Sequence, residues 1–597
     1  MVRHQEIDRP VIAVAGLGPR GMVIVERLIA HMAARPDQMM DIVLFDSNAP
    51  GAGVHRPDLP DYLLLNTVAG QLSFYPHADA VSGNAVHKGP NLHEWCQEKG
   101  LRVSSRGGMS ADPACRPVAP GDFLPRRILG QYLEDCAKRL LENLPDHIRL
   151  RLIQEKLIDV IEDTLSGRQC LVTQSGKRIW ADSLFLSLGH AREADLQSVG
   201  IKAKETVAVS GLGLTAMDTV AALTKGRGGL FAGGFDDLRY VQSGREPRIL
   251  LTSRTGLPFF ARPDWSPEED KYRVPPIFLT RDAVDRLRAE TSKTGGQLCF
   301  RTQVLPLLTL DMQAAFHITR TRLIDGEDAA NLLLQDLMML GDMPQLAAAK
   351  FAQIEDLDGP SGIERLLRTE PWQGHDPEFS RDYRAQIKAD LAQCKLGLPG
   401  SPIKAAAEVW RSQRNILRYV ANGRGLTDAS RAEFYRVFAP LSNRLVGGPQ
   451  KERHAELLAL CAADVVTLVS PESQSITADR FYAAFTGSAG TCRRDNPIVR
   501  NLLASGRIRP VDPAGLDGIS VDAHGHPLDA QGNPDTALWL VGPPVEGASF
   551  YNHYVGTPAP DCPLFVDAER EVGRCLNRID PPLGQLAAHA QNRLGAI

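Results

Sequence analysis

The hydrophobic pattern near the start of the chain changes its period twice within a short distance. Residues 11–15 form a β-branched apolar run, residues 16–21 are rich in glycine, and residues 22–32 carry apolar side chains at helical spacing. A second apolar run covers residues 41–45 and is followed by Asp46. This order predicts a strand, a tight glycine turn, a helix and a second strand, as in a dinucleotide-binding βαβ unit.

The same pattern occurs again near the middle of the chain. Residues 206–210 form an apolar run, residues 211–216 hold another glycine turn, residues 217–223 have helical periodicity, and residues 248–252 form a second strand. The separation of the two units is far longer than the period of roughly 50 residues or less that is typical of solenoid repeats. It predicts two separate nucleotide-binding domains.

From about residue 280 the pattern becomes helical, with few β-branched runs. The clearest 3.6-residue spacing is found in residues 282–291, 329–340, 345–355, 381–392 and 403–419. Strand-like runs then return at residues 463–469, 479–485 and 537–541. Because strands flank the helical stretch on both sides, we expect it to be an insertion.

The predicted fold is therefore α/β, with two Rossmann-like dinucleotide-binding domains and an α-helical inserted domain. We expect the first domain to be discontinuous and to comprise residues 1–195 and 486–597. The second is expected to comprise residues 196–279 and 440–485, and the helical insertion residues 280–439.

Composition and charge narrow the class of protein. The chain has 597 residues, of which 43% are hydrophobic and 23% charged, as is typical of a globular protein. Lys and Arg number 67 and Asp and Glu 71, so the formal net charge is −4 and no overall basic field is present to bind nucleic acid or an anionic membrane. There is no run of about 18 apolar residues. The first ten residues carry no apolar signal-peptide segment, so we expect a cytoplasmic protein.

Several reaction classes lack their motifs in this sequence. The ten cysteines are scattered singly, without a CxxC pair, which disfavours zinc ribbons and dithiol oxidoreductases. The sequence also has no GxSxG elbow of the serine hydrolases and no HExxH or other metal-spaced histidine cluster. We therefore expect neither a serine hydrolase nor a bound metal.

The glycines of the first unit have distinct roles in a dinucleotide site. Gly16 permits the turn, Gly18 lets the backbone approach a pyrophosphate, and Gly21 allows the helix to pack closely on the strand. Asp46 stands where a carboxylate accepts a hydrogen bond from a ribose hydroxyl. The alternative for Asp46 is a solvated acid that ends a strand.

The second unit differs from the first at the end of its second strand. Gly211 and Gly213 occupy the first two glycine positions and Ala216 the third, but the strand ends in Ser253 and Arg254 instead of an acid. A guanidinium group pairs with a 2′-phosphate, so these two residues favour NADPH over NADH. The alternative is that Arg254 is an exposed arginine without a nucleotide contact.

Two nucleotide sites in this order resemble those of two-dinucleotide-domain flavoproteins, in which FAD occupies the first site and NADPH the second. Further stretches make the resemblance more specific, namely residues 51–55, 64–67, 123–133, 183–190 and 496–503. They resemble a bacterial family of large FAD/NAD(P)-binding proteins that includes flavin-dependent N-monooxygenases of the nitrosuccinate synthase type. The resemblance covers about residues 10–260 and 440–575, and the helical insertion matches only in character.

This resemblance implies roles for individual residues. The ADP portion of FAD would be held by Gly16, Gly18, Gly21 and Asp46. Asn66 would lie near the isoalloxazine ring and Arg126 near the FAD phosphates. Gly542 and Pro543 fall where two-domain flavoproteins usually have a Gly-Asp pair near the ribityl chain, and the acid is absent here.

The resemblance also narrows the chemistry of the flavin. No paired cysteines accompany the flavin motifs, so a thiol–disulfide reductase is disfavoured. No tryptophan follows His190 nearby, which disfavours a Baeyer–Villiger monooxygenase. We expect an FAD- and NADPH-dependent monooxygenase that uses O₂ to oxidise the amine of a small polar amino acid. The best single candidate substrate is L-aspartate, oxidised successively to nitrosuccinate.

An acidic amino acid requires arginines, because a guanidinium group forks onto a carboxylate. Candidates near the junctions of the insertion with the sheet domains are Arg262, Arg273, Arg414 and Arg444. Asn552 and His553 follow the turn after residue 541, where the family's chain returns to the flavin, and are candidates to border the substrate. For each of these residues a purely structural or solvated role is the alternative.

Two other functions remain open from the sequence. The first is an FAD/NAD(P)H oxidoreductase or C-hydroxylase that acts on another secondary metabolite, for which the helical insertion offers room. The second is a non-catalytic flavoprotein subunit, which the missing acid beside Gly542 favours and Arg254 disfavours. The expected partners are an amino-acid substrate and O₂, without nucleic acid or membrane, and a homodimer is compatible with the sequence.

Overall fold

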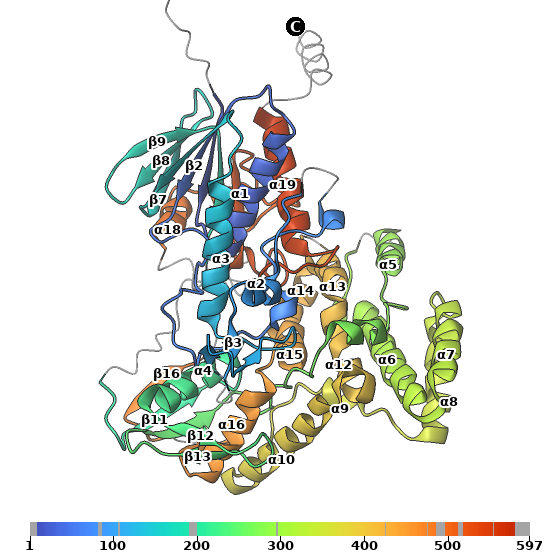
Figure 1. The fold of residues 1–597 in the computed structure, drawn as a ribbon. Helices are drawn as coiled ribbons and strands as arrows, with labels where there is room; N and C mark the ends of the chain where they lie inside the picture. The colour runs from blue at the N-terminus through green and yellow to red at the C-terminus, as the bar shows by residue number, and fades with distance from the viewer. Residues whose placement is uncertain are drawn as a thin grey trace, which may run out of the picture.

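A computed structural model of the chain describes residues 9–81, 86–104, 108–189, 200–293, 296–423, 425–473, 476–484, 496–511, 518–552 and 554–579. His190, Phe485 and His553, which belong to the sequence predictions, lie outside these residues. The described chain forms two α/β units built on parallel sheets, at the top and the lower left of Figure 1, with a helical region beside them. The predicted α/β fold with two Rossmann-like units and a helical insertion is confirmed.

The first sheet has five parallel strands in the order β17-β10-β1-β2-β6. These strands are β1 (Val11–Ala15), β2 (Met40–Phe45), β6 (Ile148–Ile153), β10 (Ser183–Ser187) and β17 (Leu538–Val541). The central strand is β1, in which Ala13 pairs with Val43 of β2 and Leu184 of β10. Because the strands are parallel, their carboxyl ends share one edge, where ligands of such sheets bind.

Different elements cover the two faces of the first sheet. One face packs on α1 (Pro19–Ala33), α3 (Arg126–Leu141) and α19 (Pro563–Ile579), as Figure 1 shows. The other packs on α18 (Pro497–Ala504) and on the antiparallel sheet of β7 (Leu157–Glu162), β8 (Gln169–Thr173) and β9 (Arg178–Ala181). Ile12 and Ala13 point to opposite faces, and both are buried. Burial on both faces explains why residues 11–15 form an unbroken apolar run.

Smaller elements fill the space below this sheet. They are α2 (Leu92–Glu98), the short 3-10 helices Ala69–Gln71 and Ala78–Ala80, and the three-stranded sheet of β3 (Arg102–Val103), β4 (Met109–Ser110) and β5 (Arg116–Pro117). Helix α2 begins with a reciprocal cap, in which the side chains of Asn91 and Glu94 each accept the backbone N–H of the other residue. Figure 1 shows α2 and β3 between the two large sheets.

The second sheet has four parallel strands in the order β15-β14-β11-β16. These are β11 (Thr206–Ser210), β14 (Arg248–Thr252), β15 (Val466–Leu468) and β16 (Arg480–Ala483). The elements packed around them are α4 (Leu214–Leu223), α16 (Lys451–Ala462), the 3-10 turn Lys225–Arg227 and the hairpin of β12 (Leu230–Ala232) and β13 (Arg239–Val241). Since β15 and β16 follow the helical region in sequence, this sheet is assembled from two distant stretches of chain.

Helices make up the region between β14 and α16. They are α5 (Arg281–Lys293), α6 (Leu305–Asp325), α7 (Glu327–Met339), α8 (Pro344–Asp358), α9 (Ile363–Leu366), α10 (Asp376–Lys395), α11 (Gly397–Gly400), α12 (Pro402–Ser412), α13 (Arg414–Ala421), α14 (Asp428–Glu433) and α15 (Ala439–Val446), with shorter turns at Pro267–Tyr272, Phe300–Val304 and Phe434–Phe438. The sequence prediction does not include α6. Its buried residues, among them Leu308 and Leu310, face two different cores, so it lacks a one-sided apolar stripe.

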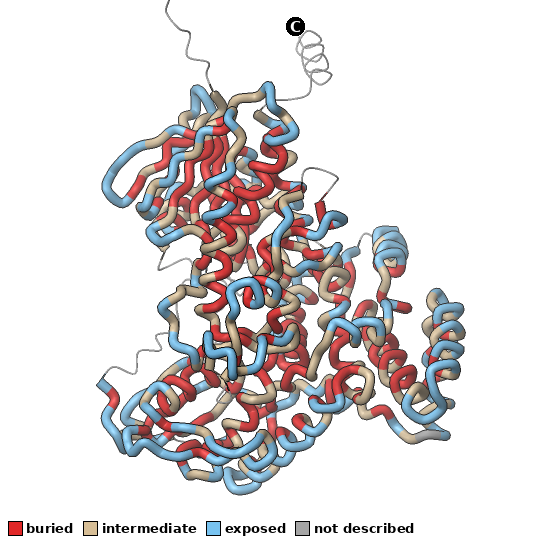
Figure 2. Tube along the Cα trace, viewed as in Figure 1, coloured by how far each residue is buried: buried red, intermediate tan, exposed pale blue. Residues whose placement is uncertain are grey.

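Helix α10 belongs by sequence to the helical insertion but packs elsewhere. Its residues Phe379, Tyr383 and Ile387 are part of the core of the second sheet. The remaining helices pack around separate cores, and Figure 2 shows more exposed chain on the outer helices α5, α7 and α8 than at the centre of the molecule. The insertion is thus anchored on the second sheet by α10.

One predicted helix is interrupted where a buried side chain binds it. The periodicity predicts one helix over residues 403–419, whereas α12 ends at Ser412 and α13 begins at Arg414. The Nε2 atom of Gln413 donates to Oδ2 of Asp311 at 2.7 Å, inside the core. Asp311 is held by three further N–H groups, from Ile277 and the next two residues. The break therefore follows from a tertiary hydrogen bond that local sequence does not display.

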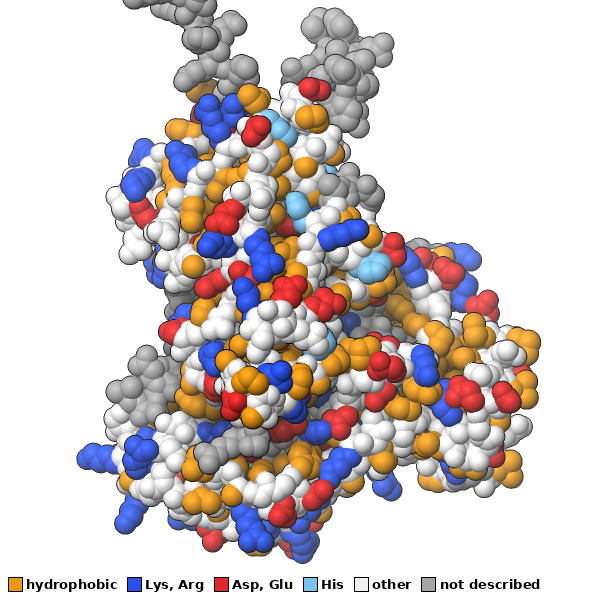
Figure 3. Space-filling model, in the orientation of Figure 1, with side chains coloured by type: hydrophobic (Ala, Val, Ile, Leu, Met, Phe, Trp, Pro, Cys, Tyr) orange, Lys and Arg blue, Asp and Glu red, His pale blue; other side chains and the backbone are white. Residues whose placement is uncertain are grey.

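Within the described residues, no helix is long and apolar enough to cross a membrane. In the same part of the chain, no group of three or more His, Cys, Asp or Glu side chains is arranged to hold a metal ion. On the face drawn in Figure 3, Lys and Arg side chains are interspersed with Asp and Glu, in keeping with the balanced net charge.

A buried charge network joins α1 to α19. The side chain of Arg27 is fully buried and pairs with Glu26, its neighbour on α1, and with Glu569 of α19, whose Oε2 lies 3.3 Å from Nη1. His31, one turn further along α1, also contacts Glu569, at 3.0 Å. Charges this deeply buried are tolerated only when they are paired, so the network holds α19 on the first unit.

We expect Arg27→Met to lower the free energy of unfolding by about 3–5 kcal/mol, because it removes the buried guanidinium group that pairs with both Glu26 and Glu569. Urea unfolding followed by circular dichroism measures the change. The matched control is Lys138→Met, which breaks an exposed pair with Glu142 and should change the free energy by less than about 1 kcal/mol. Equal losses in the two variants would contradict a stabilising role for the network.

Candidate active site

The turn between β1 and α1 is built for close approach of backbone to ligand. Gly16 has a φ of +88°, and a Cβ there would overlap the carbonyl oxygen of Ser187 at the end of β10. A Cβ on Gly21 would overlap the carbonyl oxygen of Gly16. Gly18 caps α1 without a side-chain hydrogen bond, so the first N–H groups of the helix are available to an anion. These features fit the pyrophosphate of FAD.

The other candidates for FAD contacts stand at the carboxyl edge of the first sheet. Asp46 follows β2, and its Oδ2 accepts the N–H of Leu17 at 2.7 Å, so the carboxylate braces the glycine turn. Gly542 follows β17 with a φ of +96° and lies against Arg20 of α1. Pro543 begins a short 3-10 helix. The ribose contact of Asp46 and the ribityl contact of Gly542 and Pro543 stay predictions.

Arg126 is engaged by contacts within the protein. It begins α3, its Nε donates to the carbonyl oxygen of Leu64 at 3.1 Å, and its Nη2 pairs with Asp218 of α4 at 2.6 Å. Burial raises the pKa of Asp218, against the charges of Arg126 and Arg453. Arg126 therefore ties the first unit to the helix that follows the second glycine turn. Its contact with the FAD phosphates stays a prediction.

The turn between β11 and α4 repeats the geometry of the first. Gly211 has a φ of +141°, and a Cβ there would overlap the carbonyl oxygen of Ala484, directly after β16. Gly213 caps α4 without a side-chain hydrogen bond, and a Cβ on it would lie 3.1 Å from the ring of Phe259. Ala216 is fully buried behind the turn. The second turn therefore also has the backbone of a dinucleotide site.

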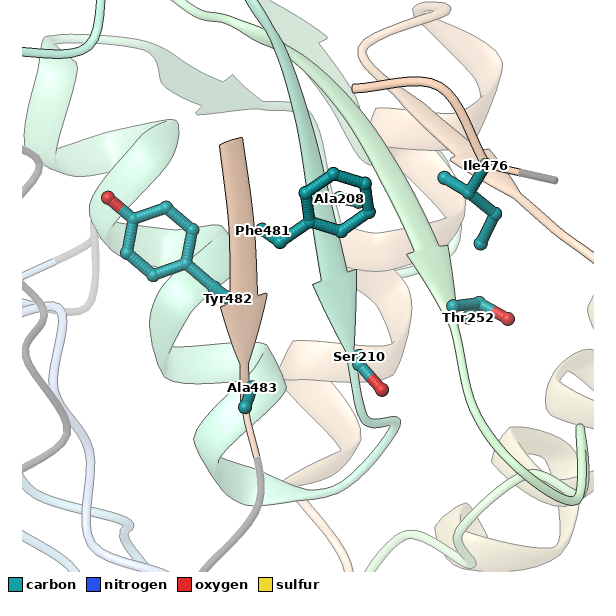
Figure 4. Close-up of a pocket in the computed structure, with 7 residues that line it drawn as sticks. All are labelled: Ala208, Ser210, Thr252, Ile476, Phe481, Tyr482 and Ala483. Atoms are coloured by element: carbon teal, nitrogen blue, oxygen red, sulfur yellow. The ribbon is translucent and has the colours of Figure 1, made fainter. Parts of the chain in front are cut away.

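A pocket of about 330 Å³ lies beside this turn (Figure 4). Ser210, Thr252 and Ala483 line it from the carboxyl ends of β11, β14 and β16. Phe481 and Ile476 supply much of its apolar wall. The pocket is thus at the edge of the second sheet where a dinucleotide is predicted to bind.

The two residues predicted to select NADPH follow directly after this edge. Ser253 accepts the N–H of Gly256 on its Oγ at 3.0 Å, which closes the turn after β14. Arg254 is exposed in that turn. An exposed guanidinium group at the end of the second strand is accessible to a 2′-phosphate, and that contact stays a prediction.

Arginine side chains from three segments converge around one glutamate. Glu408 and Arg411 lie on α12, Arg414 begins α13, and Arg262 and Arg273 follow β14 in the chain. Oε2 of Glu408 accepts a hydrogen bond from Nε of Arg411 at 2.9 Å and from Nη1 of Arg273 at 3.5 Å. We call the four arginines the arginine cluster.

Arg262 connects the arginine cluster to the first unit. It is buried, and its Nη1 donates to the carbonyl oxygen of Asn66 at 3.0 Å. Its Nη2 donates to Oε1 of Gln71 at 3.4 Å. Asn66 is the residue predicted to lie near the isoalloxazine ring, so the cluster adjoins the predicted flavin site.

The arginine cluster is short of negative charge. Burial raises the pKa of Glu408, but Arg411, Arg262 and Arg273 outweigh it and lower that pKa to about 2. Burial, followed by the charge of Arg411, lowers the pKa of Arg262 to about 9. Besides Glu408, Asp270 also accepts from Arg273, at 2.8 Å. Four guanidinium groups therefore face two carboxylates, which leaves an excess of two positive charges for an anionic ligand.

Arg414 is the member of the cluster with free donors. Its Nε and Nη2 are buried and have no hydrogen-bond partner among the described residues. These atoms form one edge of the guanidinium group, which suits the two parallel hydrogen bonds of a carboxylate. The guanidinium carbon lies 3.8 Å from the ring centroid of Tyr551. Burial lowers the pKa of Arg414 to about 10.

The remaining candidates for substrate binding are placed differently. Arg444 is buried, and its Nη2 donates to the carbonyl oxygen of Leu366 at 2.7 Å, so it stands apart from the arginine cluster. The Nδ2 atom of Asn552 donates to Oε2 of Glu546 at 2.9 Å, within its own loop. His553 lies outside the described residues. The structure thus brings together three of the four predicted arginines.

The sequence prediction does not include Glu408, Arg411 or Tyr551. The sequence does contain a pattern that indicates Glu408 and Arg411. Together with Arg414 they are spaced by three residues, so all three share one side of the predicted helix. No such signal exists for Tyr551, since its contact with Arg414 depends on how the C-terminal loop meets the insertion. Charged residues at helical spacing beside a buried face therefore indicated part of the arginine cluster.

Comparison with known proteins gives a family match over part of the chain and relatives that match most of it. Residues 13–191 match the family model described as FAD-NAD(P)-binding. Nitrosuccinic acid synthase npaA of Aspergillus oryzae is 26% identical, over 90% of this chain and 88% of that protein. A nitrosuccinate-forming L-aspartate N-monooxygenase of Streptomyces davaonensis is 27% identical, over 90% of this chain and 92% of that protein. The resemblance identified from the sequence is confirmed by these relatives and by the FAD-NAD(P)-binding match over residues 13–191.

Solved structures give a weaker match. An open crystal structure of cyclohexanone monooxygenase covers 96% of this chain and 87% of its own, with 13% identity and a TM-score of 0.38.

We expect Arg254→Ala to weaken NADPH binding by about 1.5–3 kcal/mol, the range for hydrogen bonds to a charged group, and to leave NADH nearly unchanged. Dissociation constants for both nucleotides on the FAD-loaded protein measure the effect. Arg239→Ala, at an exposed position on β13, is the matched control and should alter neither constant. An equal loss for NADPH and NADH in Arg254→Ala would contradict the 2′-phosphate assignment.

Glu408 should also make the stability of the chain depend on pH. Its pKa in the folded state, about 2, lies below the ordinary value of 4.5, so its stabilising contribution is complete above pH 4.5 and disappears as the pH falls towards 2. We expect Glu408→Gln to be less stable than the natural chain at pH 7, and the difference to shrink from pH 5 to pH 3. Urea midpoints across this range test it, with Glu433→Gln, in an outer pair with Arg301, as control. A difference that is constant with pH would refute the assignment.

Proposed function

We propose that this chain is an FAD- and NADPH-dependent N-monooxygenase that uses O₂ to oxidise the amine of L-aspartate, successively, to nitrosuccinate. The two full-length relatives are named for nitrosuccinate formation, and each matches 90% of this chain. The FAD-NAD(P)-binding match over residues 13–191 supports the cofactor part of the proposal.

The proposal that the substrate is an amino acid with carboxylates rests on Arg414, whose Nε and Nη2 have no hydrogen-bond partner among the described residues. Two buried donors without a partner are costly unless a ligand satisfies them. A carboxylate satisfies both at once through parallel hydrogen bonds. The excess of two positive charges in the arginine cluster matches the two carboxylates of aspartate, whereas a neutral substrate would leave that charge uncompensated.

The residues of the site would bind and orient the substrate. When bound, FAD reduced by NADPH activates O₂ for transfer of an oxygen atom to the amine. Arg414 holds one carboxylate, and the other members of the cluster attract the second. Arg262, fixed to the carbonyl oxygen of Asn66, keeps the cluster beside the predicted flavin ring. Orientation of this kind lowers the barrier by holding the reacting atoms together.

The placement of the cofactors follows the two glycine turns. We assign FAD to a domain of residues 1–195 and 486–597, supported by the pairing of β17 with β10. NADPH is assigned to residues 196–279 and 440–485, supported by the pairing of β15 with β14. Residues 280–439 are the helical insertion.

We further propose that the protein is a cytoplasmic homodimer. Light scattering after gel filtration tests its oligomeric state.

The first experiment is NADPH consumption by the FAD-loaded protein in air, with a panel of amino acids and polyamines, product masses and a peroxide assay. Aspartate should give products with added oxygen and little peroxide. Slow peroxide release with every amine would instead favour an oxidoreductase or C-hydroxylase with a different substrate. No bleaching of the flavin by NADPH would favour a non-catalytic subunit.

We expect Arg414→Ala to raise the KM for L-aspartate about 10- to 100-fold, because two charge-assisted hydrogen bonds are lost. Succinate, which has both carboxylates and no amine, should inhibit the natural chain competitively and the variant more weakly by a similar factor. Arg281→Ala is the matched control, since Arg281 also lies over a tyrosine ring, that of Tyr419, but is exposed. An unchanged KM in Arg414→Ala would remove Arg414 from the substrate site.

A further inference from the structure

We infer that Tyr551 is a positioning residue, whose ring holds the guanidinium group of Arg414 in the plane that receives a substrate carboxylate. The inference rests on the proposed function, because it requires Arg414 to bind the substrate. It assigns to Tyr551 no contact with the substrate itself. The ring acts through the arginine.

The contact between the two side chains is close and lies on the ring face. The guanidinium carbon of Arg414 is 3.8 Å from the ring centroid of Tyr551, well inside the ~6 Å limit of a cation–π contact. Arg411 and Arg273 are oriented by the carboxylate of Glu408. Among the described residues nothing hydrogen-bonds to Nε or Nη2 of Arg414. The tyrosine ring therefore takes the orienting role that Glu408 has for its neighbours.

The backbone of Tyr551 is held in an unfavourable conformation. Its φ is +60°, in the left-handed region that residues other than glycine rarely adopt. The half-buried carboxylate of Glu546 accepts the N–H of Tyr551 at 2.9 Å and that of Asn552 at 2.8 Å, and so stabilises the turn. A ring that only filled a core would not require this backbone. Strain of this kind, held in place by hydrogen bonds to a carboxylate, is typical of a functional position.

The ring also fixes Arg414 relative to the first glycine turn. Tyr551 stacks on Tyr554 with ring centroids 6.1 Å apart and planes 9° apart. Arg20, in the first turn of α1 directly after the glycine turn, has its guanidinium carbon 4.9 Å from the ring centroid of Tyr554. Two stacked rings thus lie between the arginine of the first unit and Arg414.

This stack bridges two cores. Tyr554 packs against the core of the first unit, whereas Tyr551 packs against the core of the insertion. The predicted flavin belongs to the first unit, and the carboxylate receptor belongs to the insertion. We therefore expect the ring of Tyr551 to set the distance between substrate and flavin. Its loss should weaken substrate binding and also waste NADPH as peroxide.

The test compares three variants of the FAD-loaded chain. Tyr551→Phe keeps the aromatic face, and it should keep the KM for L-aspartate within about twofold of that of the natural chain. Tyr551→Leu removes the face and should raise the KM about 10- to 30-fold, in line with a desolvated cation–π contact. Tyr551→Asn also removes the ring, but asparagine tolerates a positive φ, so this variant is protected against misfolding. It should match Tyr551→Leu.

Two further readouts separate positioning from general damage. Calorimetric titration with succinate should show the same loss of affinity as the KM for aspartate, without any turnover. The peroxide formed per NADPH should rise in Tyr551→Leu and Tyr551→Asn, while the rate of flavin reduction by NADPH stays unchanged. Tyr419→Leu, which removes a ring stacked with Arg281 and Arg288 on the insertion, should change none of these values.

A double-mutant cycle decides whether Tyr551 acts through Arg414. In the Arg414→Ala background, Tyr551→Leu should have no further effect on succinate binding, because the group that the ring orients is gone. Additive losses would overturn the inference, and so would an unchanged succinate affinity in both Tyr551→Leu and Tyr551→Asn. If Arg414→Ala alone had no effect on aspartate or succinate, the failure would lie in the proposed function.

Discussion

The arrangement of the site depends on one buried carboxylate, that of Glu408. Guanidinium groups repel one another, and in a buried region this repulsion is only weakly screened. Glu408 accepts hydrogen bonds from Arg411 and Arg273, and the lowering of its pKa to about 2, despite burial, shows how strongly these cations and Arg262 attract it. Without Glu408 the arginines would be expected to separate.

The arginine cluster lies at a junction of three parts of the chain because of where the helices are inserted. The chain leaves the second sheet after β14 and returns to it at β15, so the start and end of the insertion must lie close together. The N–H of Phe260 donates to the carbonyl oxygen of Arg444 at 2.9 Å, and that of Arg262 to Pro449 at 3.3 Å. Next to this crossing, Arg262 reaches Asn66 of the first unit. A charged site next to the predicted flavin follows from this topology.

Local features of the site were predictable, and features that depend on tertiary contacts were not. Gly16 and Gly211 were predicted correctly as turn residues, because a positive φ and a close backbone approach leave glycine as the suitable residue. The break between α12 and α13 was not predicted, since it follows from a hydrogen bond between Gln413 and Asp311, which are far apart in sequence. That break separates Arg411 from Arg414 onto two helices and so shapes the cluster.

The sequence by itself determined the two glycine turns, the strands that precede them, the helical character of the insertion and three of the arginines that meet in the cluster. All of these are read from residue type and short-range spacing, because the constraints act within a few residues of each other. Only the tertiary structure decided that Arg444 stands apart, that Glu408 neutralises part of the cluster, and that Tyr551 lies under Arg414. These contacts join residues on separate elements, and their energies depend on burial and distance, which no local pattern in a single sequence records.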